Sequence, residues 1–138
     1  MDTNKLLDVN IVSPERVIFS GKAVSVSVPG SQSPFQVLFN HAPIVSSLDM
    51  GVVKIVDESE KTLYFATTKG FTEVRKNLVS ILVDNAENAA ECDKKEIEEK
   101  LSNAFKKYED AKTHEEKVLA HQELVETKNI LKVIELSN

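Results

Sequence analysis

The chain has 138 residues, of which 41% are hydrophobic and 28% are charged, a composition that indicates one ordinary globular protein. Its net charge of −5 argues against a general nucleic-acid-binding protein, because such proteins need a basic surface. No apolar run approaches the roughly 20 residues that span a bilayer, so direct insertion into a membrane is not expected. Residues 1–5 lack the pattern of a signal peptide and Cys92 is the single cysteine, so we expect residence in a reducing cytoplasm.

The first part of the chain has the pattern of short strands. All four glycines and all four prolines lie between Pro14 and Gly70, where they can form turns. Between them, apolar side chains alternate with other residues in runs that place one set in a common core; the runs are Val24, Val26 and Val28; Phe35, Val37 and Phe39; Val53 and Ile55; Leu63 and Phe65; and Val79, Ile81 and Val83. About eight to ten such strands predict a β-sandwich or barrel.

After Ala86 the apolar spacing changes to that of helices. The first set is Ile97, Leu101, Ala104, Tyr108 and Ala111, and the second is Ala120, Leu124, Thr127, Leu131 and Ile134. Each set follows a capping box, which starts at Asp93 in one case and at Thr113 in the other. We therefore predict an antiparallel hairpin of two helices, about 93–112 and 114–136, in a domain 87–138 that follows a β-domain 1–86.

The predicted hairpin has little apolar surface with which to hold itself closed. Its apolar stripes are narrow and include alanine and threonine, and helices of this kind depend on tertiary contacts. We therefore expect the hairpin to open and to occupy at least two arrangements.

The sequence shows no constellation of an active site, so we expect no catalytic residues, cofactor or metal. His41, His114 and His121 lie far apart, and none is spaced from Cys92 as zinc ligands are. Basic residues around the predicted helix turn allow two interpretations, either solubilising charge or a docking face for an acidic partner.

Six segments in order, from about residue 7 to 136, are similar to motifs of one family, the epsilon subunit of F-type ATP synthases of bacterial type. These segments are Val12–Gly21, Val28–Ser31 with His41–Val45, Gly51–Ile55, Lys69–Val74, Val79–Glu87 and Lys132–Leu136. The resemblance implies a ten-stranded β-sandwich followed by a helical hairpin.

The resemblance also implies a function. Epsilon is a non-catalytic rotor subunit of the central stalk, where its sandwich contacts the gamma subunit and the proton-driven c-ring at the cytoplasmic face of the inner membrane. Its helical arm inhibits ATP hydrolysis in many bacteria by extending toward the alpha/beta catalytic head. By this resemblance the ring contacts fall on Ser31, Gln32, Ser33 and His41, and the contacts of the arm with the beta subunit fall on Lys106, Lys107, Lys117, Lys128 and Lys132.

The chain departs from this family pattern at two places. Many bacterial members bind ATP through Ile/Leu-Asp-x-x-Arg-Ala, and here only Asp93 of that motif remains, with Glu96 in place of the arginine. We therefore expect no tight ATP binding and interpret Asp93 as a helix cap. The ring-facing loop also lacks the acidic residues common in relatives. Two alternative functions stay open. The chain could be a free-standing β-sandwich adaptor that binds another protein through its helices, or an ATP-sensing module.

Overall fold

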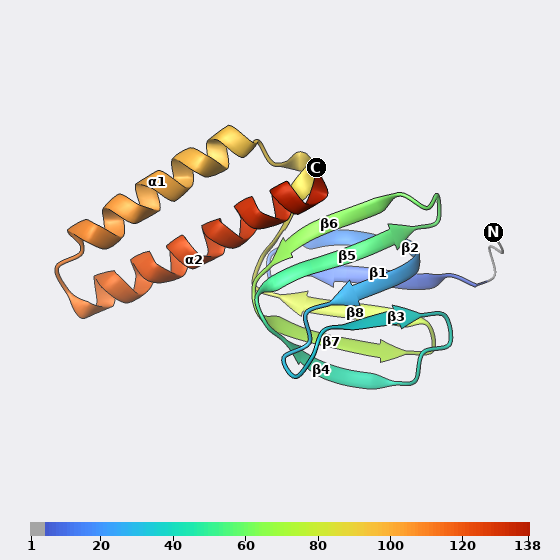
Figure 1. The fold of residues 1–138 in the computed structure, drawn as a ribbon. Coiled ribbons are helices and arrows are strands. Elements are labelled where there is room, and N and C mark those ends of the chain that lie inside the picture. Colours follow the sequence, from blue (N-terminus) through green and yellow to red (C-terminus); the bar gives the residue numbers. More distant parts are fainter. Residues whose placement is uncertain (1–4) are drawn as a thin grey trace.

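Nine strands precede two long helices in the computed structural model, which describes residues 5–138 (Figure 1). The signal-peptide prediction refers to residues 1–5, of which residues 1–4 lie outside this range. The strands are β1 (Leu7–Val12), β2 (Val17–Val28), β3 (Phe35–Leu38), β4 (Ile44–Leu48), β5 (Gly51–Asp57), β6 (Thr62–Thr67), β7 (Gly70–Arg75), β8 (Leu78–Val83) and β9 (Ala86–Asn88). A short 3-10 helix, η1 (Ala89–Glu91), leads to α1 (Lys94–Asp110) and α2 (His114–Ser137).

The long strand β2 belongs to both layers of the sandwich. The strand order is β4-β7-β8-β1-β2-β5-β6-β9, and β3 also pairs with β2. The first half of β2 pairs with β1, whereas its second half lies between β3 and β5. The prediction of a sandwich is therefore confirmed. The described residues contain nine strands rather than the predicted ten, and β2 runs as one strand through both layers.

The period-two pattern identified most of the core. Nine of the predicted core residues are buried: Val26, Val28, Val37, Val53, Ile55, Phe65, Val79, Ile81 and Val83. Two positions differ from the prediction.

A bulge and a turn explain these two differences. Between Ala23 and Ser25 the pairing of β2 with β5 shifts register, and Ala23 takes the core position in place of half-buried Val24. Strand β3 ends at Leu38, so Phe39 lies in the turn that contains Asn40 at φ 63°.

One close backbone approach holds the start of β7 against β8. A Cβ atom added to Gly70 would lie 2.0 Å from the carbonyl oxygen of Leu82. Because no other residue lacks a Cβ, only glycine fits at this point. The approach aligns Phe71 beside Leu82 on the outer face of the sheet.

The two helices form the predicted antiparallel hairpin, which we call the arm. Of the ten residues predicted for the apolar faces, Ala104, Ala120, Leu124, Thr127 and Ile134 are buried and the other five are half-buried. Asp93 caps α1 by accepting a hydrogen bond of 2.9 Å from the Lys95 amide.

The second helix begins at a cap whose two hydrogen bonds fall on neighbouring residues. The Thr113 hydroxyl accepts from the Glu116 amide at 3.1 Å, and the Glu116 carboxylate accepts from the Lys112 amide at 3.0 Å. Glu116 thus reaches one residue further back than a capping box requires, and the chain breaks between α1 and α2 as predicted.

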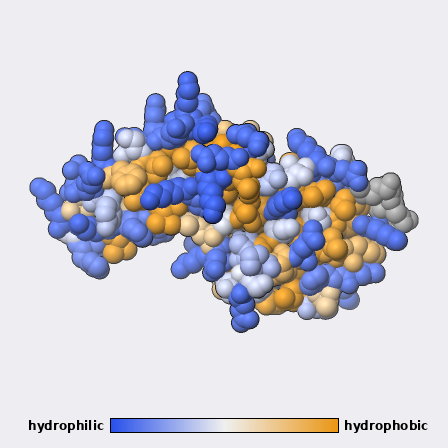
Figure 2. Space-filling view, in the orientation of Figure 1, coloured by the Kyte–Doolittle hydropathy of each residue, from blue (hydrophilic) through white to orange (hydrophobic). Residues whose placement is uncertain are grey.

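The arm contacts the sandwich near one end only, and its turn at residues 111–113 projects away from the strands (Figure 1). At the contact, Val133 and Ile134 of α2 pack with Ala66 and Ala89. Hydrophobic surface continues across this junction, while hydrophilic side chains project from both helices (Figure 2). Neither helix in the described part of the chain is long and apolar enough to cross a membrane.

Candidate docking surfaces

A row of exposed apolar side chains crosses the outer face of the sheet that contains β4, β7, β8 and β1. Phe71 lies opposite Leu82, which lies opposite Val12, and Val12 pairs with Val17 of β2. On β4, Ser47 lies opposite Phe71 and Val45 lies diagonally from it. Apart from half-buried Val12, these apolar residues are between 54% and 72% exposed. We call Val12, Val17, Val45, Phe71 and Leu82 the apolar row.

The solvated face of an antiparallel sheet is normally polar. A contiguous exposed apolar patch marks a site of interaction, so the apolar row can bury another protein's apolar surface.

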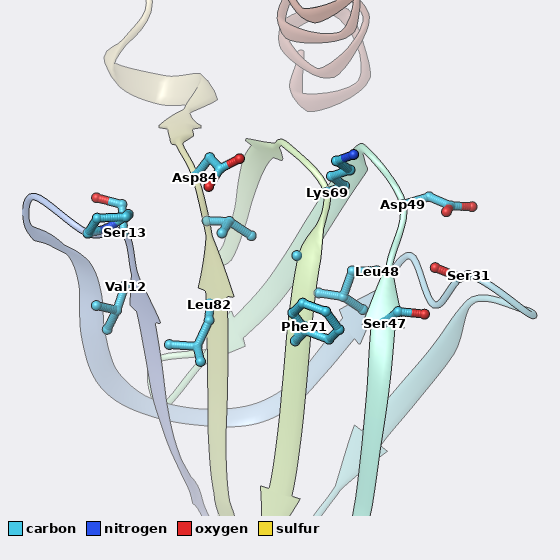
Figure 3. Close-up of a pocket in the computed structure, with 13 residues that line it drawn as sticks. Val12, Ser13, Ser31, Ser47, Leu48, Asp49, Lys69, Phe71, Leu82 and Asp84 are labelled. Carbon is cyan, nitrogen blue, oxygen red and sulfur yellow. The ribbon is translucent and has the colours of Figure 1, made fainter.

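A hollow of 690 Å³ adjoins the apolar row at the end of the sandwich that faces α2. Figure 3 shows Phe71 and Leu82 side by side below the loops that carry Lys69 and Asp84, with Asp49 on the neighbouring turn. The surface therefore combines an apolar floor with charged groups at its rim, as protein interfaces do.

The four residues assigned to the ring contact lie at the two ends of β3. Ser31, Gln32 and Ser33 are exposed in the loop before β3, and His41 is half-buried in the turn after it. The His41 ring stacks on the Phe35 ring, with 6.3 Å between centroids. This stacking connects the two groups of residues.

A pair of asparagines fixes the turn that carries His41. The Asn40 amide donates to the Asn77 side-chain oxygen at 2.6 Å, and the Asn77 side-chain nitrogen donates to the Asn40 side-chain oxygen at 3.2 Å. The β3–β4 turn is thereby tied to the β7–β8 turn.

All five lysines assigned to the arm contact are exposed. Lys107 forms an ion pair with Glu123 at 3.4 Å. The Lys117 ammonium lies 5.3 Å from the centre of the Tyr108 ring, and the Lys128 ammonium lies 5.2 Å from that of Phe105. Lys106 lines a groove between the helices near their turn, and Lys132 is exposed on α2.

The position of the degenerate ATP motif is occupied by a helix start. The Asp93 carboxylate is bonded to the Lys95 amide, and Glu96 is exposed in the first turn. Neighbouring Cys92 packs against the arm–sandwich contact, and burial, together with Glu87 and Glu91, raises the pKa of its thiol. This setting disfavours a reactive thiolate.

Among residues 5–138 no group of three or more histidine, cysteine, aspartate or glutamate side chains is arranged to hold a metal ion. The described residues offer two exposed surfaces, the apolar row with its charged rim and the lysines of the arm.

Sequence reasoning missed the apolar row and the contact of Asn129 with Gly51. The run Leu78–Val83 contains a signal for the row, because its apolar side chains occupy both faces of the strand. No local signal indicates the pairing of Asn129 with a carbonyl 78 residues earlier.

Comparison with known proteins decides the family. The model of the ATP synthase delta/epsilon chain, β-sandwich domain, matches residues 6–89, which is more than half of the chain. The chain belongs to this ATP synthase delta/epsilon family. It is therefore a non-catalytic subunit of a membrane-associated enzyme complex.

Relatives extend the similarity into the arm. An ATP synthase epsilon chain of Leptospira interrogans is 36% identical over 77% of this chain and 82% of the relative. A chloroplastic epsilon chain of Pyropia yezoensis is 31% identical over 86% of this chain and 87% of its own length.

Solved structures share the fold at low sequence identity. A chain from Euglena gracilis mitochondrial ATP synthase has a TM-score of 0.69 at 16% identity, and the match covers 95% of this epsilon-family chain and 78% of the other. A chain from the central stalk and c-ring of Tetrahymena thermophila mitochondrial ATP synthase has a TM-score of 0.55 at 18% identity, with 96% of each chain covered.

Proposed function

We propose that this ATP synthase subunit works in the central stalk, where it couples the c-ring to the catalytic head and carries an arm that inhibits ATP hydrolysis. In this proposal the sandwich, residues 1–86, is a fixed coupling body and residues 87–138 form a regulatory arm. The subunit would act at the cytoplasmic face of a bacterial inner membrane. The observation that carries the proposal is the apolar row on an epsilon-family sandwich.

The apolar row supports docking to the gamma subunit. A stalk subunit that transmits torque needs a broad contact that does not slip, and burial of apolar surface supplies about 25 cal/mol per Å² toward it. The charged rim of Asp49, Lys69 and Asp84 can orient the partner. The loop 31–33 and His41 would contact the ring, through uncharged polar groups and one imidazole.

The lysines of the arm support docking to an acidic surface of the beta subunit. Lys106, Lys107 and Lys117 lie near the free end of the hairpin, and Lys128 and Lys132 lie four residues apart on α2. In an opened arm these lysines would be spread along helices that rise about 1.5 Å per residue.

Co-purification tests the docking of the sandwich. In the Phe71→Glu, Leu82→Glu double variant, two charges enter the apolar row at positions more than half exposed, so folding should be retained while gamma no longer co-purifies. The control is Lys54→Glu, which changes charge at an exposed position of β5 in the other layer. Gamma that remains stoichiometric with the double variant would disprove docking through this row.

Hydrolysis by the reconstituted complex tests the arm. Deletion of residues 92–138 should raise ATP hydrolysis while proton pumping remains coupled. Replacement of the five assigned lysines by glutamine should raise hydrolysis with the arm still present. If neither change affects hydrolysis, the arm has no inhibitory role, and the proposal is reduced to the coupling function of the sandwich.

A further inference from the structure

The closed arm already occupies three of the five lysines assigned to docking. Lys117 lies over Tyr108, Lys128 lies over Phe105, and Lys107 pairs with Glu123. Each contact joins α1 to α2. The same cations therefore have one set of partners inside the hairpin, before any other protein is present.

The two aromatic contacts have the geometry of cation–π interactions. Their distances of 5.3 and 5.2 Å from the ring centres are within the range of about 6 Å over which the ring quadrupole attracts an ammonium group. Phe105 is 44% exposed although it is apolar, so burial alone does not explain its place on α1. The ring offers a face to Lys128 instead.

We propose that Phe105 and Tyr108 are internal competitors for the docking lysines and thereby hold the arm closed. An acidic surface can engage Lys117 and Lys128 fully only after they leave these rings. This inference rests on the proposed role of the arm. It adds that the two rings determine how readily the arm releases its lysines for docking.

The rings should bias the arm measurably. Each partly exposed cation–π contact contributes a modest free energy, and removal of both should increase the open-to-closed ratio about 5- to 30-fold. A bias of this size is suited to regulation, because a strong acidic partner can overcome it.

The interhelix distance in the intact chain tests the inference without ATP synthase. Ser102 and Gln122 are exposed, so each can be replaced by cysteine and spin-labelled in a Cys92→Ser background. Pulsed electron paramagnetic resonance then measures the distance between the labels and reports the closed and open populations. The Phe105→Leu, Tyr108→Leu variant should increase the long-distance population about 5- to 30-fold. The matched Phe105→Tyr, Tyr108→Phe variant keeps both rings and should remain within about twofold of the parent.

Lysine variants show whether the rings act through the cations. Lys117→Gln with Lys128→Gln should open the arm by itself and should make the leucine substitutions nearly silent, as a double-mutant cycle requires for coupled groups. Additive effects, or an unchanged long-distance population in the leucine variant, would overturn the inference.

The reconstituted complex separates this inference from the proposed function. The double-leucine variant should inhibit hydrolysis more strongly than the parent chain. If its arm opens but hydrolysis does not fall, the rings hold the arm closed as inferred, and the proposed inhibitory role of the arm is rejected. If its arm does not open, only the competition is rejected.

Discussion

The side-chain nitrogen of Asn129 on α2 donates a hydrogen bond of 3.0 Å to the carbonyl oxygen of Gly51 at the start of β5. This bond connects the arm to the sandwich across 78 residues of chain. Beside it, the apolar contact has four buried members, with five partly buried side chains packed against them. The hydrogen bond therefore adds a directional polar contact to the apolar packing between the arm and the sandwich.

Asn129→Ala should weaken the attachment of the arm by about 1 kcal/mol, the usual net contribution of such a hydrogen bond. Hydrogen exchange of the β5 and β6 amides next to α2 should become faster. Gln122→Ala is a suitable control, because Gln122 bonds Glu126 within the same helix at 3.2 Å and does not bond the sandwich. Equal exchange rates in both variants would show that the Asn129 hydrogen bond does not hold the arm against the sandwich.

Thr113→Ala should destabilise the start of α2 by about 1 kcal/mol, because the Glu116 amide loses its hydroxyl acceptor. Far-UV circular dichroism during thermal unfolding and exchange at residues 115–118 would report the loss. Thr113→Ser keeps the hydroxyl and should behave as the parent does. Fraying to the same extent in the serine variant would point to the lost methyl group instead.

Gly70→Ala should destabilise the sandwich by about 1–3 kcal/mol or more, since the new Cβ atom meets a backbone oxygen that cannot move aside alone. Gly21→Ala provides the comparison. There the nearest atom is the end of the Phe19 side chain, at 3.1 Å, and a side chain can rotate. Denaturant unfolding should show a lower midpoint for the Gly70 variant, and equal midpoints would contradict the close approach.

Cys92 should react slowly with iodoacetamide near pH 8 in the folded chain and faster after unfolding. The cause is the raised pKa of its thiol, which burial and then the carboxylates of Glu87 and Glu91 produce. The pKa of this thiol is higher in the folded chain than in the unfolded chain. The neutral thiol therefore stabilises the fold at pH values below the pKa of the unfolded chain, and this stabilisation is lost as the pH rises through the pKa of the folded chain.

Glu87→Gln with Glu91→Gln should therefore speed alkylation of the folded chain, because two of the groups that raise the pKa are neutralised. Rates that match in the parent and the double variant would leave burial as the only cause. Circular dichroism at the reaction pH would verify that both proteins remain folded.

The parts of the fold that depend on neighbours in sequence were predictable. Alternation identified Val79 and Ile81 as core residues, and the side-chain oxygens of Asp93 and Thr113 identified both helix starts. Phe39 was misplaced, because a period of two continues in the sequence beyond the turn that ends β3.

The surfaces were harder to predict, because they depend on which strands become neighbours. Phe71 and Leu82 lie on the consecutive strands β7 and β8, whereas Val12 lies on β1 much earlier in the chain, and only the pairing of β1 with β8 makes them one row. The contacts of the arm lysines likewise depend on the register of α1 against α2, which the helical spacing leaves open.

The passage of β2 from one layer to the other affects how the sandwich responds to load. A force applied at Val17, on the outer face of one layer, reaches Ser25 and Val28 in the other through covalent backbone. Core side chains can slide or rotate under shear, whereas a continuous strand resists extension. Ladder bonds to β1, β3 and β5 spread this tension over four strands. The two layers should therefore turn together as one stiff element.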